Sequence, residues 1–152
     1  MTEHGEMSDF DRWAAARQQA FLEREQALFS AKGLAEARHP KNIGLMLDPD
    51  GHALGVGSCG DTMEIFLRVR HERIQIAVFM TDGCGPTLAC GSMLTQMAWG
   101  KRLEAAVAIE AADLILALDG LPPEHIHCAT LAVHTLQEAI VNYRSEGKGE
   151  ND

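Results

Sequence analysis

Two stretches of alternating residues, separated by a very short link, constrain the fold more than any other feature of the sequence. In residues 63–70 the apolar positions are Met63, Ile65, Leu67 and Val69, and Phe66 is the one exception. Residues 73–81 repeat the alternation at Ile74, Ile76, Val78 and Met80. A period of two is typical of half-buried strands. Because the link is only HER, we expect the two strands to pair antiparallel.

Helical patterns flank this hairpin on both sides. Strong helix formers occupy about 9–37 and predict one long helix or two short ones. The loop-forming segment 39–61 carries one short strand at about 52–57. After Gly85 the apolar period becomes helical, and helical segments continue to about residue 144. The sequence therefore predicts an α+β fold, in which a small antiparallel β-sheet of about three strands is packed by helices.

Length and charge limit the class of protein. A chain of 152 residues with 46% apolar residues can bury one core. A formal net charge of −9 argues against nucleic acid as a partner. No apolar run reaches the ~18 residues of a membrane span, and the acidic, polar start resembles neither a signal nor a transit peptide. We therefore expect a cytoplasmic protein whose cysteines stay reduced.

Three of the four cysteines lie at junctions between predicted elements, where functional groups concentrate. They are Cys59 in GSCGD, Cys84 in DGCGP and Cys128 in HIHC, and Asp61 and His127 stand beside two of them. The fourth, Cys90, lies on a buried helical stripe and is interpreted as a small core residue, or alternatively as a thiol that assists the site.

The surroundings of Cys84 favour a reactive sulfur. Gly83 and Gly85 can adopt φ values that other residues avoid, which would expose the sulfur. Pro86 is suited to the first position of a helix, so Cys84 would lie at a helix N-terminus, where the thiolate is favoured over the thiol. Thiolates bind soft metals and attack sulfur. The group Cys59, Asp61, Cys84, His127 and Cys128 is therefore a candidate metal or sulfur-transfer site.

Each member of this group also has an ordinary interpretation. The Gly-Cys-Gly run could be a tight turn, Asp61 a turn residue that bonds its own backbone, and His127 a surface or core histidine. Cys128 also fits the apolar stripe of its helix. The intervals of 25 and 44 residues between the cysteines do not resemble a CxxC zinc site, so spacing alone leaves these alternatives open.

A set of motifs in a fixed order resembles a known family. The motifs are HPKNIG, CGDTM, TDGCGPTLA, GKRLEAA and LPPEHIHCATLA, followed by a closing AIxxY. They are similar to the IscU family and to the N-terminal domain of NifU, which are scaffolds for iron–sulfur cluster assembly. The likeness runs from about Phe29 to Tyr143. It divides the chain into an N-terminal helical extension (1–28), a scaffold domain (29–144) and a disordered tail (145–152).

The resemblance implies a fold, a cargo and a set of ligands. The fold would be IscU/SufE-like, and the protein would be a non-enzymatic scaffold that builds a transient, labile [2Fe-2S] cluster. Its partners would be a cysteine desulfurase, which donates sulfur, and apo-proteins, which accept the cluster. The family's ligands for the cluster, for iron and often for zinc carry over onto Cys59, Asp61, Cys84, His127 and Cys128. Cys128 or Cys59 would accept the sulfur first.

The physical chemistry of this ligand set suits a carrier. Stable iron–sulfur proteins usually use four thiolates. A carboxylate or an imidazole in place of one soft sulfur holds iron less tightly, so Asp61 would favour release.

Three departures from the family pattern limit the comparison. The stretch LPPEH stands where the family's Hsp70-type chaperone site reads LPPVK, which argues against that chaperone as a partner. The extension 1–28 has no counterpart, and Cys90 replaces a serine.

Two alternative functions remain at this stage. One is a zinc-dependent sulfur acceptor of the SufU type, in which Cys59, Asp61, Cys84 and Cys128 hold Zn²⁺. His127 and the uninterrupted stretch from Cys84 to Cys128 favour IscU and NifU over it. The other is a structural zinc module without sulfur transfer. A cysteine hydrolase is disfavoured, because no oxyanion loop is evident.

Overall fold

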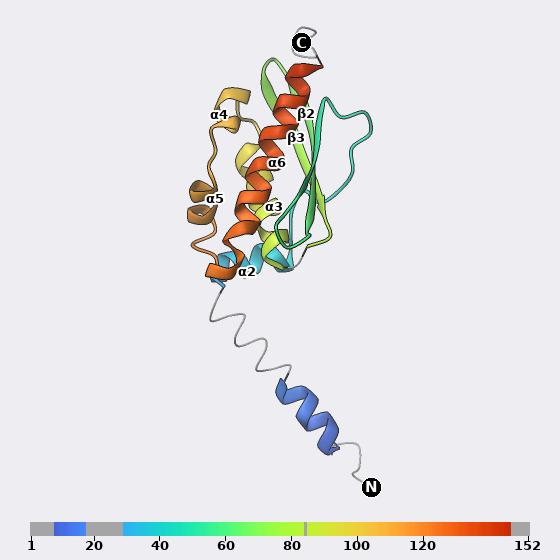
Figure 1. Ribbon diagram of the computed structural model, residues 1–152, viewed down its shortest axis with the longest axis vertical. Coiled ribbons are helices and arrows are strands. Elements are labelled where there is room, and N and C mark those ends of the chain that lie inside the picture. The colour runs from blue at the N-terminus through green and yellow to red at the C-terminus, as the bar shows by residue number, and fades with distance from the viewer. Residues whose placement is uncertain (1–7, 18–28, 84, 147–152) are drawn as a thin grey trace.

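The computed structural model describes residues 8–17, 29–83 and 85–146. A helical segment at 9–17 precedes the main body (Figure 1). The elements that follow are α2 (Ala31–Arg38), β1 (Gly51–Val56), β2 (Thr62–Arg70), β3 (Arg73–Thr81), α3 (Gly85–Ala98), α4 (Leu103–Val107), α5 (Ala111–Ala117), the 3₁₀ turn η2 (Pro123–His125) and α6 (Ile126–Ser145). The predicted α+β class is confirmed. Cys84 lies outside the described residues, as does most of the predicted extension and tail.

The strands form one antiparallel sheet in the order β1-β2-β3. The predicted hairpin closes with a two-residue turn, because Arg70 pairs with Arg73 across His71 and Glu72. Both turn residues have positive φ, 53° and 62°. This conformation matches the twist of the flanking strands and is the favoured one for so short a link.

One part of the predicted strand pattern is wrong. Ile74 is buried as expected, but beyond it Ala77 and Phe79 face the core, in place of Ile76, Val78 and Met80. The cause is a bulge: Val69 pairs with Ile74 and Arg68 with Ile76, so Gln75 has no opposite residue. One extra residue reverses the face of every side chain after it.

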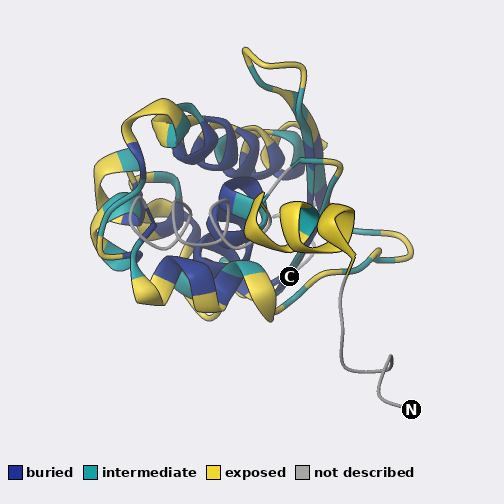
Figure 2. Cartoon of the chain, turned by 90° about the horizontal axis from the view of Figure 1, so that it is seen from below, coloured by how far each residue is buried: buried dark blue, intermediate teal, exposed yellow. Residues whose placement is uncertain are grey.

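Helices cover one face of the sheet (Figure 1). The long helix α6 packs on β1 and β2, and α3 packs on β3. Buried residues face the interior of this arrangement, whereas the helix at 9–17 is largely exposed (Figure 2). The predicted stripe of α6 is buried throughout, at Cys128, Leu131, Thr135, Leu136, Ala139 and Tyr143.

The middle of α3 lies very close to the sheet. Gly91 faces the Phe79 ring of β3, and a Cβ at this glycine would lie 2.3 Å from a ring carbon. Cys90, next to it, is fully buried in the core, as predicted. Within the described ranges, no helix is long and apolar enough to cross a membrane.

Candidate metal centre

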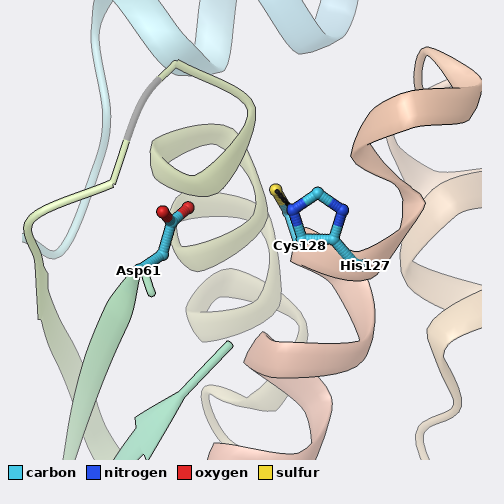
Figure 3. Close-up of side chains that lie close together, drawn as sticks. All are labelled: Asp61, His127 and Cys128. Atoms are coloured by element: carbon cyan, nitrogen blue, oxygen red, sulfur yellow. Dashed lines mark hydrogen bonds between the residues drawn. The ribbon is translucent and has the colours of Figure 1, made fainter. Parts of the chain in front are cut away.

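The described site residues come from two segments that lie close together, the β1–β2 loop and the start of α6. Cys59 lies in the β1–β2 loop and Asp61 directly before β2, while His127 and Cys128 lie in the first turn of α6. The loop is held closed by hydrogen bonds from Gly57 N to Asp61 O (2.7 Å) and from Gly60 N to Gly57 O (3.0 Å). This places Asp61 opposite the start of α6 (Figure 3).

The first residue of β2 fixes the position of Asp61 further. Thr62 donates its backbone N–H to Asp82 Oδ1 (2.7 Å), and its carbonyl accepts a hydrogen bond from Thr81 Oγ1. The N–H of Thr62 also holds the pKa of Asp82 below its usual value. The end of β3 therefore anchors the strand that carries Asp61.

The side chains of Asp61, His127 and Cys128 converge on one point. One potential ligand atom from each lies within 4.8 Å of the others. His127 Nε2 is 3.8 Å from Cys128 Sγ and 3.2 Å from Cys59 Sγ. Ligand bonds of ~2.0–2.3 Å around a tetrahedral ion put neighbouring ligand atoms roughly 3.3–3.8 Å apart. The chemistry and spacing of these donors fit a metal ion, and a small closure around the ion would complete the fit.

Exposure differs sharply within the group. Cys59 is exposed, Asp61 and His127 are half-buried, and Cys128 is 1% exposed. The site is therefore open to solvent on the Cys59 side and closed at Cys128. A hollow of about 310 Å³ between the end of β1 and α6 adjoins it through His127.

The fifth predicted residue, Cys84, lies outside the described residues, so its membership stays a prediction. Its neighbours are described, and Gly85 opens α3. The unusual φ predicted for Gly83 is wrong, because this residue does not adopt a left-handed φ. Gly83 instead provides space, because a Cβ there would lie 2.7 Å from the Thr87 side chain.

Sequence reasoning missed Thr87. This residue is fully buried in the first turn of α3. Its hydroxyl donates to Asp61 Oδ2 at 3.0 Å and lies 3.3 Å from Cys128 Sγ. It was visible in the GCGPT motif, but a threonine in a helix gives no signal that separates a site residue from a packed one.

The comparison with known families agrees with the geometry. The family described as the NifU-like N-terminal domain matches residues 29–149. The chain belongs to this family. The predicted resemblance is thereby confirmed for most of the chain.

Several relatives of this NifU-like chain are iron-sulfur cluster assembly scaffold proteins by name. IscU 1 of Archaeoglobus fulgidus is 40% identical over 123 residues, which cover 80% of each chain. IscU of Aquifex aeolicus is 37% identical and covers 76% of this chain and 75% of its own. IscU of Escherichia coli (strain K12) is 35% identical, with 78% and 95% covered.

Solved structures show the same fold. A NifU-like N-terminal protein from Brucella abortus has a TM-score of 0.61 at 20% identity, covering 77% of this chain and 94% of that one. A SUF-system scaffold from Fervidobacterium islandicum has a TM-score of 0.63 at 18% identity, with 74% and 96% covered. At these identities the likeness concerns the fold alone.

Proposed function

We propose that this NifU-like chain is a scaffold for iron–sulfur cluster assembly, which builds a labile [2Fe-2S] cluster as cargo and transfers it to apo-proteins. The observation that carries the proposal is the convergence of Asp61, His127 and Cys128, with Cys59 in contact with His127. The names of relatives at 35–40% identity support it, and they describe scaffolds and not enzymes.

The donor set suits a cargo that must leave. Thiolates of Cys59, Cys128 and Cys84 would hold iron firmly, whereas the carboxylate of Asp61 and the imidazole of His127 are harder ligands. The open side at Cys59 gives a partner access to the site. A resident, permanently held cluster would be better served by four thiolates in a closed pocket.

Sulfur would enter as persulfide from a cysteine desulfurase. A thiolate of this chain attacks the outer sulfur of the donor's Cys–S–SH group, the donor's S–S bond breaks, and the donor cysteine leaves as a thiolate. The new persulfide then needs two electrons per sulfur, from an external electron donor, to become sulfide. Cys59 is the accessible acceptor, and Cys128 is the other candidate.

The first test concerns Asp61. We expect Asp61→Ala to lengthen the half-time of cluster transfer to an apo-ferredoxin several-fold. The reason is that the carboxylate, a harder ligand that favours release of the cluster, is no longer present. Transfer is followed by visible absorption or circular dichroism. Glu64→Ala removes a carboxylate three residues along the chain, whose partner is His52 and not a site residue, and should transfer as the wild type does. Unchanged or faster transfer by Asp61→Ala contradicts the proposal.

A zinc-dependent sulfur acceptor is the second candidate, because the close spacing of Asp61, His127 and Cys128 also suits Zn²⁺. Colour separates the two functions. Anaerobic incubation with Fe²⁺, cysteine and a desulfurase should produce visible charge-transfer bands for a scaffold. A protein that stays colourless and retains tightly bound zinc would favour the zinc-dependent sulfur acceptor, or a structural zinc module, over the scaffold.

A further inference from the structure

We propose that the Thr87 hydroxyl is a positioning group of this site: it occupies one oxygen of Asp61, so that the carboxylate binds metal through the other oxygen only. The inference rests on the proposed function, because it takes Asp61 as a ligand. It adds a residue that none of the predicted motifs marks as functional and a specific coordination mode.

The contacts of Thr87 point across the site and not along its own helix. Its Oγ1 lies 3.0 Å from Asp61 Oδ2 and 3.3 Å from Cys128 Sγ. Two turns later on α3, Thr95 is buried to a similar degree, yet its hydroxyl bonds to the carbonyls of Gly91 and Ser92. That backbone bond is common for a threonine inside a helix. Thr87 lies in the first turn and uses its hydroxyl to link β2 with α6.

Packing alone does not explain a hydroxyl at this position. Thr87 is fully buried, and valine has nearly the same shape without a polar atom that needs a partner. The chain is also shaped around this side chain, because a Cβ at Gly83 would lie 2.7–2.8 Å from three of its atoms. One glycine of the GCG motif therefore makes room for Thr87.

The direction of the hydrogen bond determines what Asp61 can offer to a metal. A hydroxyl has a single hydrogen, so Thr87 donates to one partner at a time. The Asp61 oxygen is the nearer of the two acceptors, and oxygen accepts hydrogen bonds more strongly than sulfur does, so the carboxylate is the preferred partner. Asp61 Oδ2 is thus engaged, and Oδ1 remains for the metal. Without the hydroxyl, both oxygens become available, and the coordination number rises by one.

Cobalt reports coordination number directly. Anaerobic Co²⁺ titration of the wild type should give the intense visible d–d bands of a four-coordinate site, together with thiolate-to-cobalt bands. Thr87→Val should keep the thiolate bands but show the weaker, shifted d–d bands of a five-coordinate site. Thr87→Ser retains the hydroxyl and should restore the wild-type spectrum. If Thr87 had a purely structural role, the folded Thr87→Val protein would keep the wild-type spectrum, and serine would have nothing to restore.

A second background isolates the role of Asp61. If the hydroxyl acts through this carboxylate, Thr87→Val should change the cobalt spectrum of an Asp61→Asn protein very little. Thr87→Ala, which removes the hydroxyl without adding a methyl near the carboxylate, gives the same comparison if the valine variant does not fold. A wild-type spectrum in the folded valine or alanine variant overturns this inference alone. Failure of the wild type to bind Co²⁺ overturns the metal site and the inference with it.

Discussion

The two described cysteines of the site differ sharply in exposure. Cys59 is exposed beside His127, whereas Cys128 is buried in the first turn of α6, 3.3 Å from the Thr87 hydroxyl. A molecule that approaches from solvent therefore reaches Cys59 before Cys128. The motifs alone treat the two thiols as equivalent, and the fold distinguishes them.

Alkylation should reveal this difference. In a metal-free Cys84→Ser protein, we expect iodoacetamide to modify Cys59 at least ~10-fold faster than Cys128, because only an accessible thiolate reacts readily. Peptide mass spectrometry measures both rates, and the buried Cys90 is an internal reference that should react slowest. Equal rates for Cys59 and Cys128 would contradict the described burial.

The sequence identified most of the site at this scale, for physical reasons. Four described residues can be grouped from the sequence because each lies at or beside the end of an element, where functional groups concentrate. They are Cys59, Asp61, His127 and Cys128. Which of them bind metal came from the family resemblance and stays a prediction. Thr87 escaped notice because its role depends on distances across three elements.

At the scale of elements, one buried carboxylate fastens α2 to α3. Glu36 accepts hydrogen bonds from Ser92 Oγ (2.5 Å) and Gln96 Nε2 (2.9 Å) on α3, and from Lys41 Nζ (3.0 Å). Burial raises the pKa of Glu36, but the hydrogen bonds from Ser92, Lys41 and Gln96 and the charge of Lys41 outweigh it, so the pKa lies below its usual value.

The contribution of Glu36 to the free energy of unfolding should depend on pH. Because folding lowers the pKa of Glu36, its contribution is present above the unfolded pKa and is lost as pH falls through the folded value. We expect Glu36→Gln to lower the free energy of unfolding by about 1–3 kcal/mol at pH 7, and the difference from the wild type to shrink toward pH 3. Urea unfolding at several pH values measures this. The exposed Glu124 is the control, and Glu124→Gln should show no such trend. A constant difference for Glu36→Gln would contradict this pH dependence.

The bulge at Gln75 gives a second prediction at this scale. Removing Gln75 leaves Ile74 opposite Val69 and Ile76 opposite Arg68, so Ala77 and Phe79 stay in the core. Removing Val78 instead turns Phe79 out of the core. We expect the Gln75 deletion to retain a cooperative thermal transition, with a lower Tm, and the Val78 deletion to lose it. Loss of the transition in both proteins would show that the bulge itself is required.

The sequence predicted about three strands and the antiparallel pairing of β2 with β3, but neither the pairing of β1 with β2 nor this bulge. Residues 76–80 are all apolar, so the alternation does not tell which face of this part of β3 is buried, and a pattern shows the faces of a strand only while pairing stays regular. The irregularity arises where β2 and β3 pair, near the turn, and has no local signal. Element types were therefore predictable, whereas the buried face of β3 was not.

At the scale of the whole molecule, the site joins segments that are far apart in the chain. Asp61 directly precedes β2 and Cys128 belongs to α6, and these two elements pack together only in the folded state. An ion held by both residues should therefore stabilise the fold as a whole.

Zinc provides the measurement. With free Zn²⁺ at 100 times the dissociation constant, linkage adds about 2.7 kcal/mol to the free energy of unfolding, which corresponds to a rise in Tm of a few degrees. Differential scanning calorimetry should show this rise in the wild type and not in Cys128→Ser. Cys90→Ser changes a thiol in the core and should keep the zinc-dependent rise. A rise of equal size in Cys128→Ser would place the ion elsewhere.

The contact between Gly91 and Phe79 extends the site beyond its own residues. Thr87 lies one turn before Gly91 on the same helix. The spacing between α3 and the sheet at Gly91 and Phe79 therefore affects the distance between the Thr87 hydroxyl and the Asp61 carboxylate. A single methyl group at residue 91 would lift that turn of α3 from the sheet and lengthen the reach between hydroxyl and carboxylate. If the protein holds a cluster as proposed, the lifetime of that cluster would therefore depend on a contact in the core, with every ligand left unchanged.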